Sequence, residues 1–188
     1  MNLEEIKKEV KNILTERRYT HSVNVMEKCE ELAIIYGEDI EKAKLVGIAH
    51  DIAKEMSTDE MFKYIQDNNI EIDDIEKRCP QLLHAKIGAD ICKKKYNFSE
   101  DMVRAIEAHT TGKANMDKLA KILYISDAIS KERDYDCVEE ARDLSKKDLN
   151  ETILFLINNF INECKDRNIT IHPDAFETIK SIKKDKRD

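Results

Sequence analysis

The sequence predicts an all-α fold with a metal site in its core, on three observations. Hydrophobic residues recur at helical spacing along nearly all of the 188 residues. Glycine and proline number only four and two, which is typical of helix-rich proteins rather than of sheets joined by many turns. Histidine and aspartate residues fall on or beside several expected helices. About nine helices are expected in all.

The first helices are delimited by their caps. Gly37 is the expected C-cap of a helix that starts near His21. Residues 46–50, in the next helix, are almost free of polar side chains, so this helix should lie central and buried. Ser57 and Glu60 have the spacing of a capping box at the start of the helix after it.

Later helices show similar punctuation. Pro80 breaks the chain before the helix of His84. Ser99 is the expected N-cap of the following helix, which the segment 110–112 closes. Asp127 lies midway along an otherwise apolar helix.

Composition limits the classes of function. The chain of 21.9 kDa is expected to form one domain, residues 1–188. The net charge of −7 argues against a nucleic-acid partner, whose phosphates need Lys and Arg. Five widely spaced cysteines without a CxxC motif predict no disulfide framework, and a reducing cytoplasm is the expected location. No signal peptide or membrane-spanning run is recognisable, so no membrane partner is expected.

A series of metal-binding residue types runs through the expected helices. Imidazole and carboxylate groups hold borderline transition metals. A single such residue is more often a core or capping residue, but four of the five histidines belong to this series, which predicts a shared site. Its members are His21, His50, Asp51, His84, His109 and Asp127.

The placement of these residues supports the prediction. His50 and Asp51 are adjacent, about 100° apart on a helix, and reach one cavity only near a helix end. Asp127 needs a cation or hydrogen-bond donors, because burying an unpaired carboxylate is costly. A metal ion would supply the cation. The alternative is that Asp127 bonds only to a neighbouring histidine or backbone amide.

Five local strings carry a resemblance to a known family. They are RYTHSV at 18–23, HDIAK at 50–54, LLHAKIGA at 82–89, AHTTG at 108–112 and YISD at 124–127. In this order they resemble the HD-domain metal-dependent phosphohydrolase superfamily and, within it, the YqeK family of bacterial symmetrical diadenosine tetraphosphate hydrolases. The resemblance covers about residues 11–182 and implies an HD-domain helical bundle with its metal site in the core.

One departure from that family follows Asp127. The family tends to have a proline before an arginine there, whereas this chain reads Ala128-Ile129-Ser130-Lys131-Glu132-Arg133. Losing the proline loosens a turn more than it removes chemistry. The expected activity therefore stands, while the loop geometry is less determined.

The resemblance implies an iron-dependent hydrolase that splits diadenosine tetraphosphate into two ADP molecules. A first iron would be held by four ligands: His21, His50, Asp51 and Asp127. Asp51 would bridge to a second ion held by His84 and His109. With one ion only, these two histidines would instead contact phosphate. Manganese, cobalt or zinc are alternatives, because such ligands accept each of them.

Further residues are assigned to catalysis and substrate binding. Asp51, Lys54 and Arg133 are the expected catalytic residues, the two cations stabilising charge on phosphate. Taken singly, a Lys or Arg is usually an exposed, solvated charge. Expected substrate contacts are Arg18, His84, His109, Thr110, Thr111, Arg133 and His172. Each of three assignments has an alternative. Arg18 would pair either with phosphate or with an acidic neighbour, and residues 110–112 would either donate to phosphate or only close a helix. His172 would either stack on a base or cap a loop.

Several other functions fit the same ligands. A nucleotidase or cyclic-nucleotide phosphodiesterase keeps the metal site and changes the substrate, and a di-iron oxygenase is a more distant alternative. A nucleotide-sensing module that binds without turnover is a third, although no ligand of the series is missing. A dinucleoside polyphosphate or nucleotide is the expected partner, and a homodimer is left open.

Overall fold

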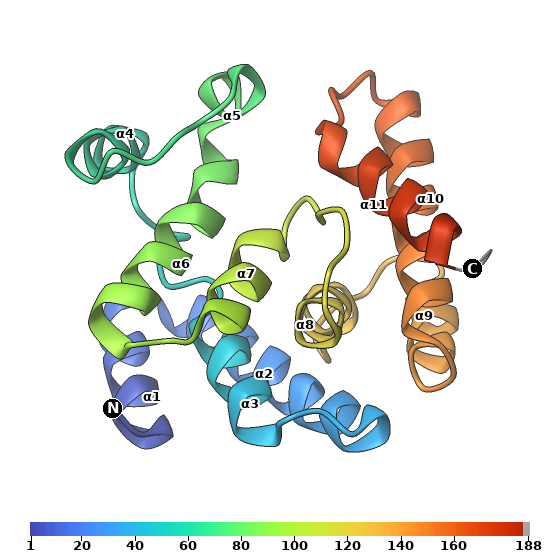
Figure 1. Cartoon of the computed structure of the whole chain (residues 1–188), viewed down its shortest axis with the longest axis horizontal. Coiled ribbons are helices and arrows are strands. Elements are labelled where there is room, and N and C mark those ends of the chain that lie inside the picture. Colours follow the sequence, from blue (N-terminus) through green and yellow to red (C-terminus); the bar gives the residue numbers. More distant parts are fainter. Residues whose placement is uncertain (186–188) are drawn as a thin grey trace.

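The computed structural model describes residues 1–185, which form helices joined by turns with no strand among them (Figure 1). This confirms the all-α prediction. In chain order the helices are α1 (Leu3–Ile13), α2 (Glu16–Tyr36), α3 (Ile40–Ala49), α4 (Thr58–Asp67), α5 (Asp74–Arg78), the 3-10 helix η1 (Pro80–Leu82), α6 (Leu83–Tyr96), α7 (Glu100–Ala108), α8 (Lys118–Ile129), α9 (Val138–Ser145), α10 (Leu149–Asp166) and α11 (Pro173–Asp185).

The helices are arranged around α7 and α8. Figure 1 shows α4 and α5 at one end of the molecule, α9, α10 and α11 at the other, and α7 and α8 between them. Helices α2 and α3 pack against each other, and both contact α8. The expected domain includes residues 186–188, which lie outside the described residues, and its extent stays a prediction.

Two hydrophobic clusters hold these helices together. The larger draws buried residues from α1 to α3 and α6 to α11, with Ile48, Ile122 and Ile157 fully buried. The smaller lies between α4 and α6, where Met61 and Ile65 contact the region of Leu83. Burying such side chains is the dominant favourable contribution to folding.

Most of the expected punctuation is confirmed. Gly37 ends α2 in the left-handed conformation, with φ of 62°, which glycine adopts without steric cost. Ser57 and Glu60 form the expected capping box at α4. Ser99 is the N-cap of α7, but its hydroxyl donates to the Asp101 carboxylate at 2.5 Å instead of capping the backbone.

The expectation of about nine helices is low, because residues 1–185 contain eleven α-helices and η1. The short helices explain the difference. Helix α5 has five residues and α9 has eight, too few turns for a clear hydrophobic period. Pro80 does not leave a plain break but starts η1, which leads into α6.

Helix α3 is central and buried, as predicted, and it packs closely against α2. Residues 46–50 are all buried. A Cβ on Gly47 would lie 2.7 Å from the Met26 Cα and 3.2 Å from the Cys29 Sγ, closer than side-chain atoms normally approach. Glycine therefore lets the two helices meet, and this contact lies directly beside the end of α3 that bears His50.

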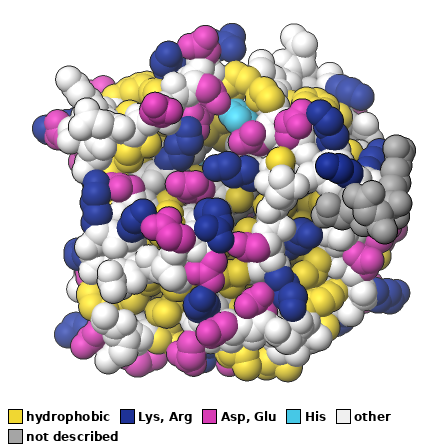
Figure 2. All heavy atoms as spheres, viewed as in Figure 1, with side chains coloured by type: hydrophobic (Ala, Val, Ile, Leu, Met, Phe, Trp, Pro, Cys, Tyr) yellow, Lys and Arg dark blue, Asp and Glu magenta, His cyan; other side chains and the backbone are white. Residues whose placement is uncertain are grey.

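The surface carries both signs of charge. Figure 2 shows basic and acidic side chains interspersed across one face, so the described residues of that face form no extended basic area. None of the helices in residues 1–185 has both the length and the apolar character that a membrane span requires.

Replacing Gly47 by alanine should lower the free energy of unfolding by about 1–3 kcal/mol, the usual cost of overpacking a tight core. Helix propensity alone would act in the opposite direction, stabilising by roughly 0.5–1 kcal/mol. Urea denaturation gives the sign directly. The exposed Glu41→Ala on the same helix should change stability by less than about 0.5 kcal/mol, and a stabilised Gly47→Ala would show that α2 and α3 separate without cost.

Candidate metal centre

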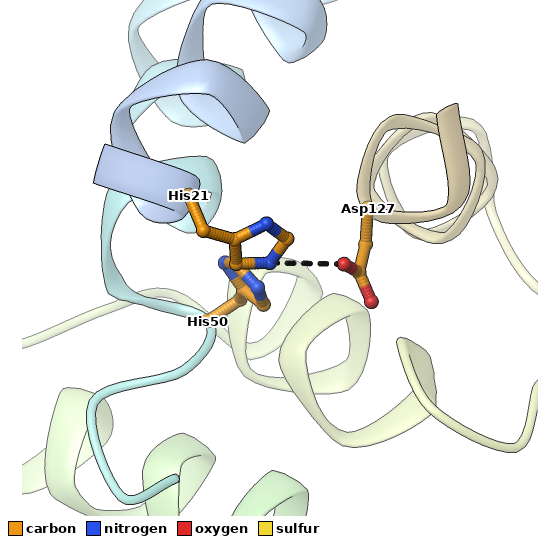
Figure 3. A group of neighbouring side chains, drawn as sticks. All are labelled: His21, His50 and Asp127. Carbon is orange, nitrogen blue, oxygen red and sulfur yellow. Dashed lines mark ion pairs between the residues drawn. The ribbon is translucent and has the colours of Figure 1, made fainter. Parts of the chain in front are cut away.

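Six residues of the predicted series meet in the core from five different parts of the chain. His21 lies in the second turn of α2, His50 and His109 directly follow α3 and α7, and His84 is the second residue of α6. Asp51 follows His50, and Asp127 lies in α8. All are buried except Asp127, whose side chain is 21% exposed. Figure 3 shows the rings of His21 and His50 on one side and the Asp127 carboxylate on the other, with a dashed line marking the His21–Asp127 ion pair.

The Nδ1 atoms of all four histidines are held by oxygen acceptors. The His50 Nδ1 lies 2.8 Å from the Gly47 carbonyl, and the His109 Nδ1 lies 2.6 Å from the Ile106 carbonyl. The His84 Nδ1 contacts the Gln81 carbonyl in the same way. A carbonyl only accepts, so each of these Nδ1 atoms carries the proton and donates. In each neutral ring the Nε2 atom therefore carries the lone pair.

The fourth histidine uses a carboxylate for the same purpose. The His21 Nδ1 contacts Glu132 Oε1, and Glu132 is itself held by Asn24 at 2.6 Å and Ser130 at 2.7 Å. Protein ligands of metals typically have such outer partners, which fix the tautomer and the orientation of the ring.

The Nε2 atoms of the four histidines lie close together in the core, where few hydrogen-bond donors are available for their lone pairs. Within residues 1–185, neither the His21 Nε2 nor the His50 Nε2, both fully buried, has a hydrogen-bond donor, and the nearest groups to them are carboxylate oxygens. The His84 and His109 Nε2 atoms lie 3.1 Å apart, and the Lys54 ammonium and the Thr110 hydroxyl are the donors within reach of this pair. Unpartnered buried polar atoms are rare and costly. A cation between these groups removes that cost.

Asp51 lies between two pairs of histidines. Its Oδ2 is 3.4 Å from the His50 Nε2 and 3.7 Å from the His21 Nε2. Its Oδ1 is 3.4 Å from the His84 Nε2 and 3.7 Å from the His109 Nε2. Each carboxylate oxygen thus faces its own pair of imidazoles.

Asp127 completes the side formed by His21 and His50. Its Oδ1 lies 3.1 Å from the His21 Nε2 and accepts a 2.6 Å hydrogen bond from Arg133. It therefore has a histidine neighbour, as the non-metal alternative required, and a cation in addition. Two overlapping sets of donors are close enough to hold an ion, His21 with His50 and Asp127, and His50 with Asp51 and His109. The cluster is able to hold a metal ion.

The pKa shifts favour the metal-binding forms of His84 and Asp51 but not that of His50. Burial, with His109 and Lys54 nearby, lowers the pKa of His84 to about 3, so this ring is neutral and its lone pair available at neutral pH. Burial raises the pKa of Asp51, but the neighbouring imidazoles of His50 and His109 outweigh it and hold that pKa far below its usual range. For His50, burial lowers the pKa and the charge of Asp51 raises it by more, so a metal ion would have to displace a proton from its Nε2.

Three cationic side chains surround the cluster. Arg18 donates to Asp51 Oδ2 at 2.9 Å, so it has the acidic neighbour of one alternative, and its contact with phosphate stays a prediction. Lys54 Nζ lies 3.1 Å from the His84 Nε2, and burial lowers its pKa against the opposing charge of Asp51. The Arg133 guanidinium donates to the Asp127 carboxylate at 2.6 Å and to the Asp127 backbone carbonyl at 3.0 Å.

Of the segment 110–112, Thr110 reaches the cluster. Its hydroxyl lies 3.2 Å from the His84 Nε2 and 3.1 Å from the His109 Nε2. The Thr111 hydroxyl donates to the Gly112 carbonyl instead. Gly112 has φ of 73°, and a Cβ there would lie 2.6 Å from Thr178 Oγ1, so glycine suits both the turn and the contact with α11.

His172 lies outside the cluster. Its Nε2 is 2.8 Å from Asp73 Oδ2, which joins the turn before α11 to the start of α5. Its Nδ1 accepts from the Asp174 backbone amide at 3.2 Å, the loop-capping arrangement. A stacking contact between His172 and a base stays a prediction.

Two residues of the site were missed from the sequence. Glu132 holds His21, and Arg142 of α9 donates to the carbonyls of Ile129, Ser130 and Arg133 at 3.1, 2.8 and 2.9 Å. Arg142 thereby holds the loop that carries both Glu132 and Arg133. Neither residue has a local signal, because a Glu and an Arg in charged segments normally read as exposed.

A cavity of about 770 Å³ opens beside the cluster. Its lining includes Lys54, His109, Thr110, Asp127 and Arg133, and it continues along α10. This volume is in the range of small-molecule sites, about 300–1,000 Å³.

The sequence from 18 to 132 matches the family profile of the HD domain, which spans the whole ligand series. The chain belongs to the HD domain family. The chain is also similar over nearly its full length to bacterial proteins named symmetrical bis(5'-nucleosyl)-tetraphosphatase. The Halalkalibacterium halodurans protein is 38% identical over 174 residues, 92% of each chain. The Bacillus subtilis protein is 36% identical over 179 residues, 95% of this chain and 96% of the relative.

A solved HD-domain structure has the same fold over nearly its full length. It is an HD superfamily hydrolase from Clostridium acetobutylicum, described as involved in NAD metabolism. It is 34% identical, has a TM-score of 0.94 and covers 98% of both chains. The expected HD-domain fold is thereby confirmed.

Replacing His50 or Asp51 by alanine should abolish both metal binding and hydrolysis, because each removes a donor that faces more than one other ligand. The loss should be larger for Asp51, which faces both pairs of histidines. Elemental analysis of anaerobically purified protein measures the metal, and Asp143→Ala, an exposed carboxylate of α9, is the control. Wild-type metal content or activity in either variant would exclude this centre.

Proposed function

We propose that the protein hydrolyses diadenosine tetraphosphate symmetrically, in a metal-dependent reaction that yields two ADP molecules. The observation that carries the metal-dependent part is the convergence of four Nε2 atoms on the two carboxylates of the core. The substrate comes from the relatives, which share 36–38% of their residues with nearly the whole chain and are named for this reaction. Fold alone would not select it.

Iron is the proposed ion, in one or two copies. Four ligands, His21, His50, Asp51 and Asp127, would hold the first. Asp51 would bridge to a second beside His84 and His109, which the separate orientations of its two oxygens support. Manganese, cobalt and zinc remain alternatives, because imidazole and carboxylate accept all four. When bound, such an ion lowers the pKa of a coordinated water and polarises a phosphoryl oxygen.

The side chains around the cluster would bind and orient the polyphosphate. Lys54 and Arg133 line the cavity beside the metal ligands and bring positive charge to it. Charge-assisted contacts from such groups strengthen as negative charge develops on the phosphoryl oxygens. The Thr110 hydroxyl lies within 3.2 Å of the His84 and His109 Nε2 atoms, and it would be free to donate to a phosphate oxygen once an ion takes those lone pairs. Arg18 would orient Asp51 through its hydrogen bond and is proposed to contact a phosphate of the substrate.

The setting of the enzyme is proposed with its chemistry. All five cysteines are free, which supports the proposed reducing cytoplasm. The substrate is the proposed partner, and residues 1–188 are proposed to act as one catalytic domain. A homodimer and the absence of a nucleic-acid partner stay predictions.

Diadenosine tetraphosphate should give ADP as the sole nucleotide product. Chromatography of the products after metal loading measures this. AMP together with ATP would mean asymmetric cleavage and would contradict the proposed reaction. If no dinucleotide is hydrolysed, activity on mononucleotides or cyclic nucleotides would favour the nucleotidase or phosphodiesterase alternative, and binding without turnover would favour the sensing module.

Neutralising Lys54 or Arg133 should leave the protein folded and metal-loaded but lower kcat/KM. The expected loss is about 100-fold or more for each of Lys54→Met and Arg133→Met, because each removes one stabilising cation from the phosphate. Metal analysis separates this role from positioning, since Arg133 also holds Asp127. The matched control is Lys131→Met, an exposed lysine of the same loop. Wild-type kinetics in both variants would show that these two charges do not act on the substrate.

A further inference from the structure

The cavity beside the metal ligands has a second end that the proposed chemistry does not use. The same space of about 770 Å³ runs from the cluster to α10 and to the loop before α9. The lining residues at this second end include Tyr135, Asp136, Leu156, Asn159, Phe160, Glu163 and Asp166. A ligand bound at the cluster can therefore extend to α10 without leaving the cavity.

One face of α10 is directed at this space. The residues that line it, Leu156, Asn159, Phe160 and Glu163, have the i, i+3, i+4, i+7 spacing of a single helical face. The core-facing side of the same helix carries Ile153, Ile157 and Ile161, which are buried. Phe160 is thus an aromatic residue that α10 presents to the cavity rather than to the core, with 49% of its surface exposed.

A second aromatic ring reaches the cavity from another element. Tyr135, in the loop between α8 and α9, is 39% exposed, and its hydroxyl donates to the Ala128 carbonyl at 3.0 Å. That hydrogen bond holds the ring in place beside the end of α8. A lone exposed aromatic residue needs no explanation. Two aromatic residues from different elements that line one cavity, with the buried Leu156 between polar neighbours, provide an apolar surface for a flat ligand.

The charges divide the cavity into two ends. Lys54 and Arg133 lie at the metal end, whereas the acidic side chains Asp136, Glu163 and Asp166 line the α10 end. Glu163 is partly compensated by Arg167 at 2.8 Å. Carboxylates repel phosphate but accept hydrogen bonds from amino groups. A nucleotide in this cavity is therefore oriented with its phosphates at the cluster and its base at α10.

We propose that Phe160 and Tyr135, with Leu156, form the subsite for one nucleobase of the substrate. The proposal rests on the proposed function, because it places the phosphates of the same ligand at the metal cluster. Bases stack on aromatic side chains, and every base offers a flat face for this. Phe160 is thereby a residue for substrate affinity, and the chemical step is left to the cluster.

Calorimetric titration of the metal-loaded protein with ADP and with inorganic pyrophosphate tests the subsite. Both ligands carry the diphosphate, and only ADP carries a base. Phe160→Ala should weaken ADP binding roughly tenfold, the usual effect of losing one stacked base, and leave pyrophosphate binding unchanged. Phe160→Tyr should retain ADP affinity. Phe176→Ala, a residue of α11 with 48% exposure that does not line the cavity, is the matched control and should bind both ligands as the wild type does.

Kinetics with diadenosine tetraphosphate provide the second measurement. Phe160→Ala should raise KM and leave kcat within about twofold, because a base contact formed equally in ground and transition states affects binding alone. A fall in kcat with unchanged KM would contradict the subsite. Equal weakening of ADP and pyrophosphate binding in Phe160→Ala would also contradict it. So would a wild-type protein that binds ADP no more tightly than pyrophosphate.

The two proposals fail in different ways. A wild-type protein that binds ADP through Phe160 but does not hydrolyse diadenosine tetraphosphate refutes the proposed function and leaves the subsite intact. A Phe160→Ala variant with wild-type ADP affinity and wild-type KM refutes the subsite, while its hydrolysis of the dinucleotide supports the function. Circular dichroism of each variant verifies its fold, and Phe160→Tyr covers the case in which the alanine variant does not fold.

Discussion

The structure depends on the cost of bringing four imidazoles and two carboxylates into one buried space. Buried polar groups without partners destabilise a fold by amounts comparable to a large fraction of its net stability. The chain limits this cost on the outer side of each ring, where the Nδ1 atoms donate to three backbone carbonyls and to Glu132. On the inner side the Nε2 atoms face the carboxylates and one another, and a cation would bind between them.

Those outer partners explain where the helices end. His50 and His109 each follow the last residue of a helix, so their Nδ1 atoms reach carbonyls of the last turn, three residues earlier. Asp51 can then turn into the cavity next to His50. The close approach of α3 to α2 at Gly47 brings this helix end beside His21. The cluster therefore requires both the end of α3 at His50 and the close packing of α3 against α2.

The loop between α8 and α9 joins the metal ligands to the substrate cavity. It carries Glu132, which holds His21, Arg133, which holds Asp127, and Tyr135, which lines the cavity. Arg142 fixes the loop by donating to its backbone carbonyls. Because the same short segment contacts two ligands and the cavity wall, a change in its backbone would affect both metal binding and substrate binding.

The sequence by itself determined the helical fold, the HD-domain resemblance and the six residues of the cluster. Hydrophobic period and caps are local signals, and a scarce residue type such as histidine, repeated at helix ends in a fixed order, stands out from its surroundings. Only the tertiary structure decided that Arg18 contacts Asp51, that Asp51 faces two pairs of histidines, and that His172 lies against Asp73. Glu132, Arg142 and Phe160 were also beyond sequence reasoning. They lie in ordinary charged or amphipathic segments, and their roles come from partners distant in the chain, which local residue patterns do not encode.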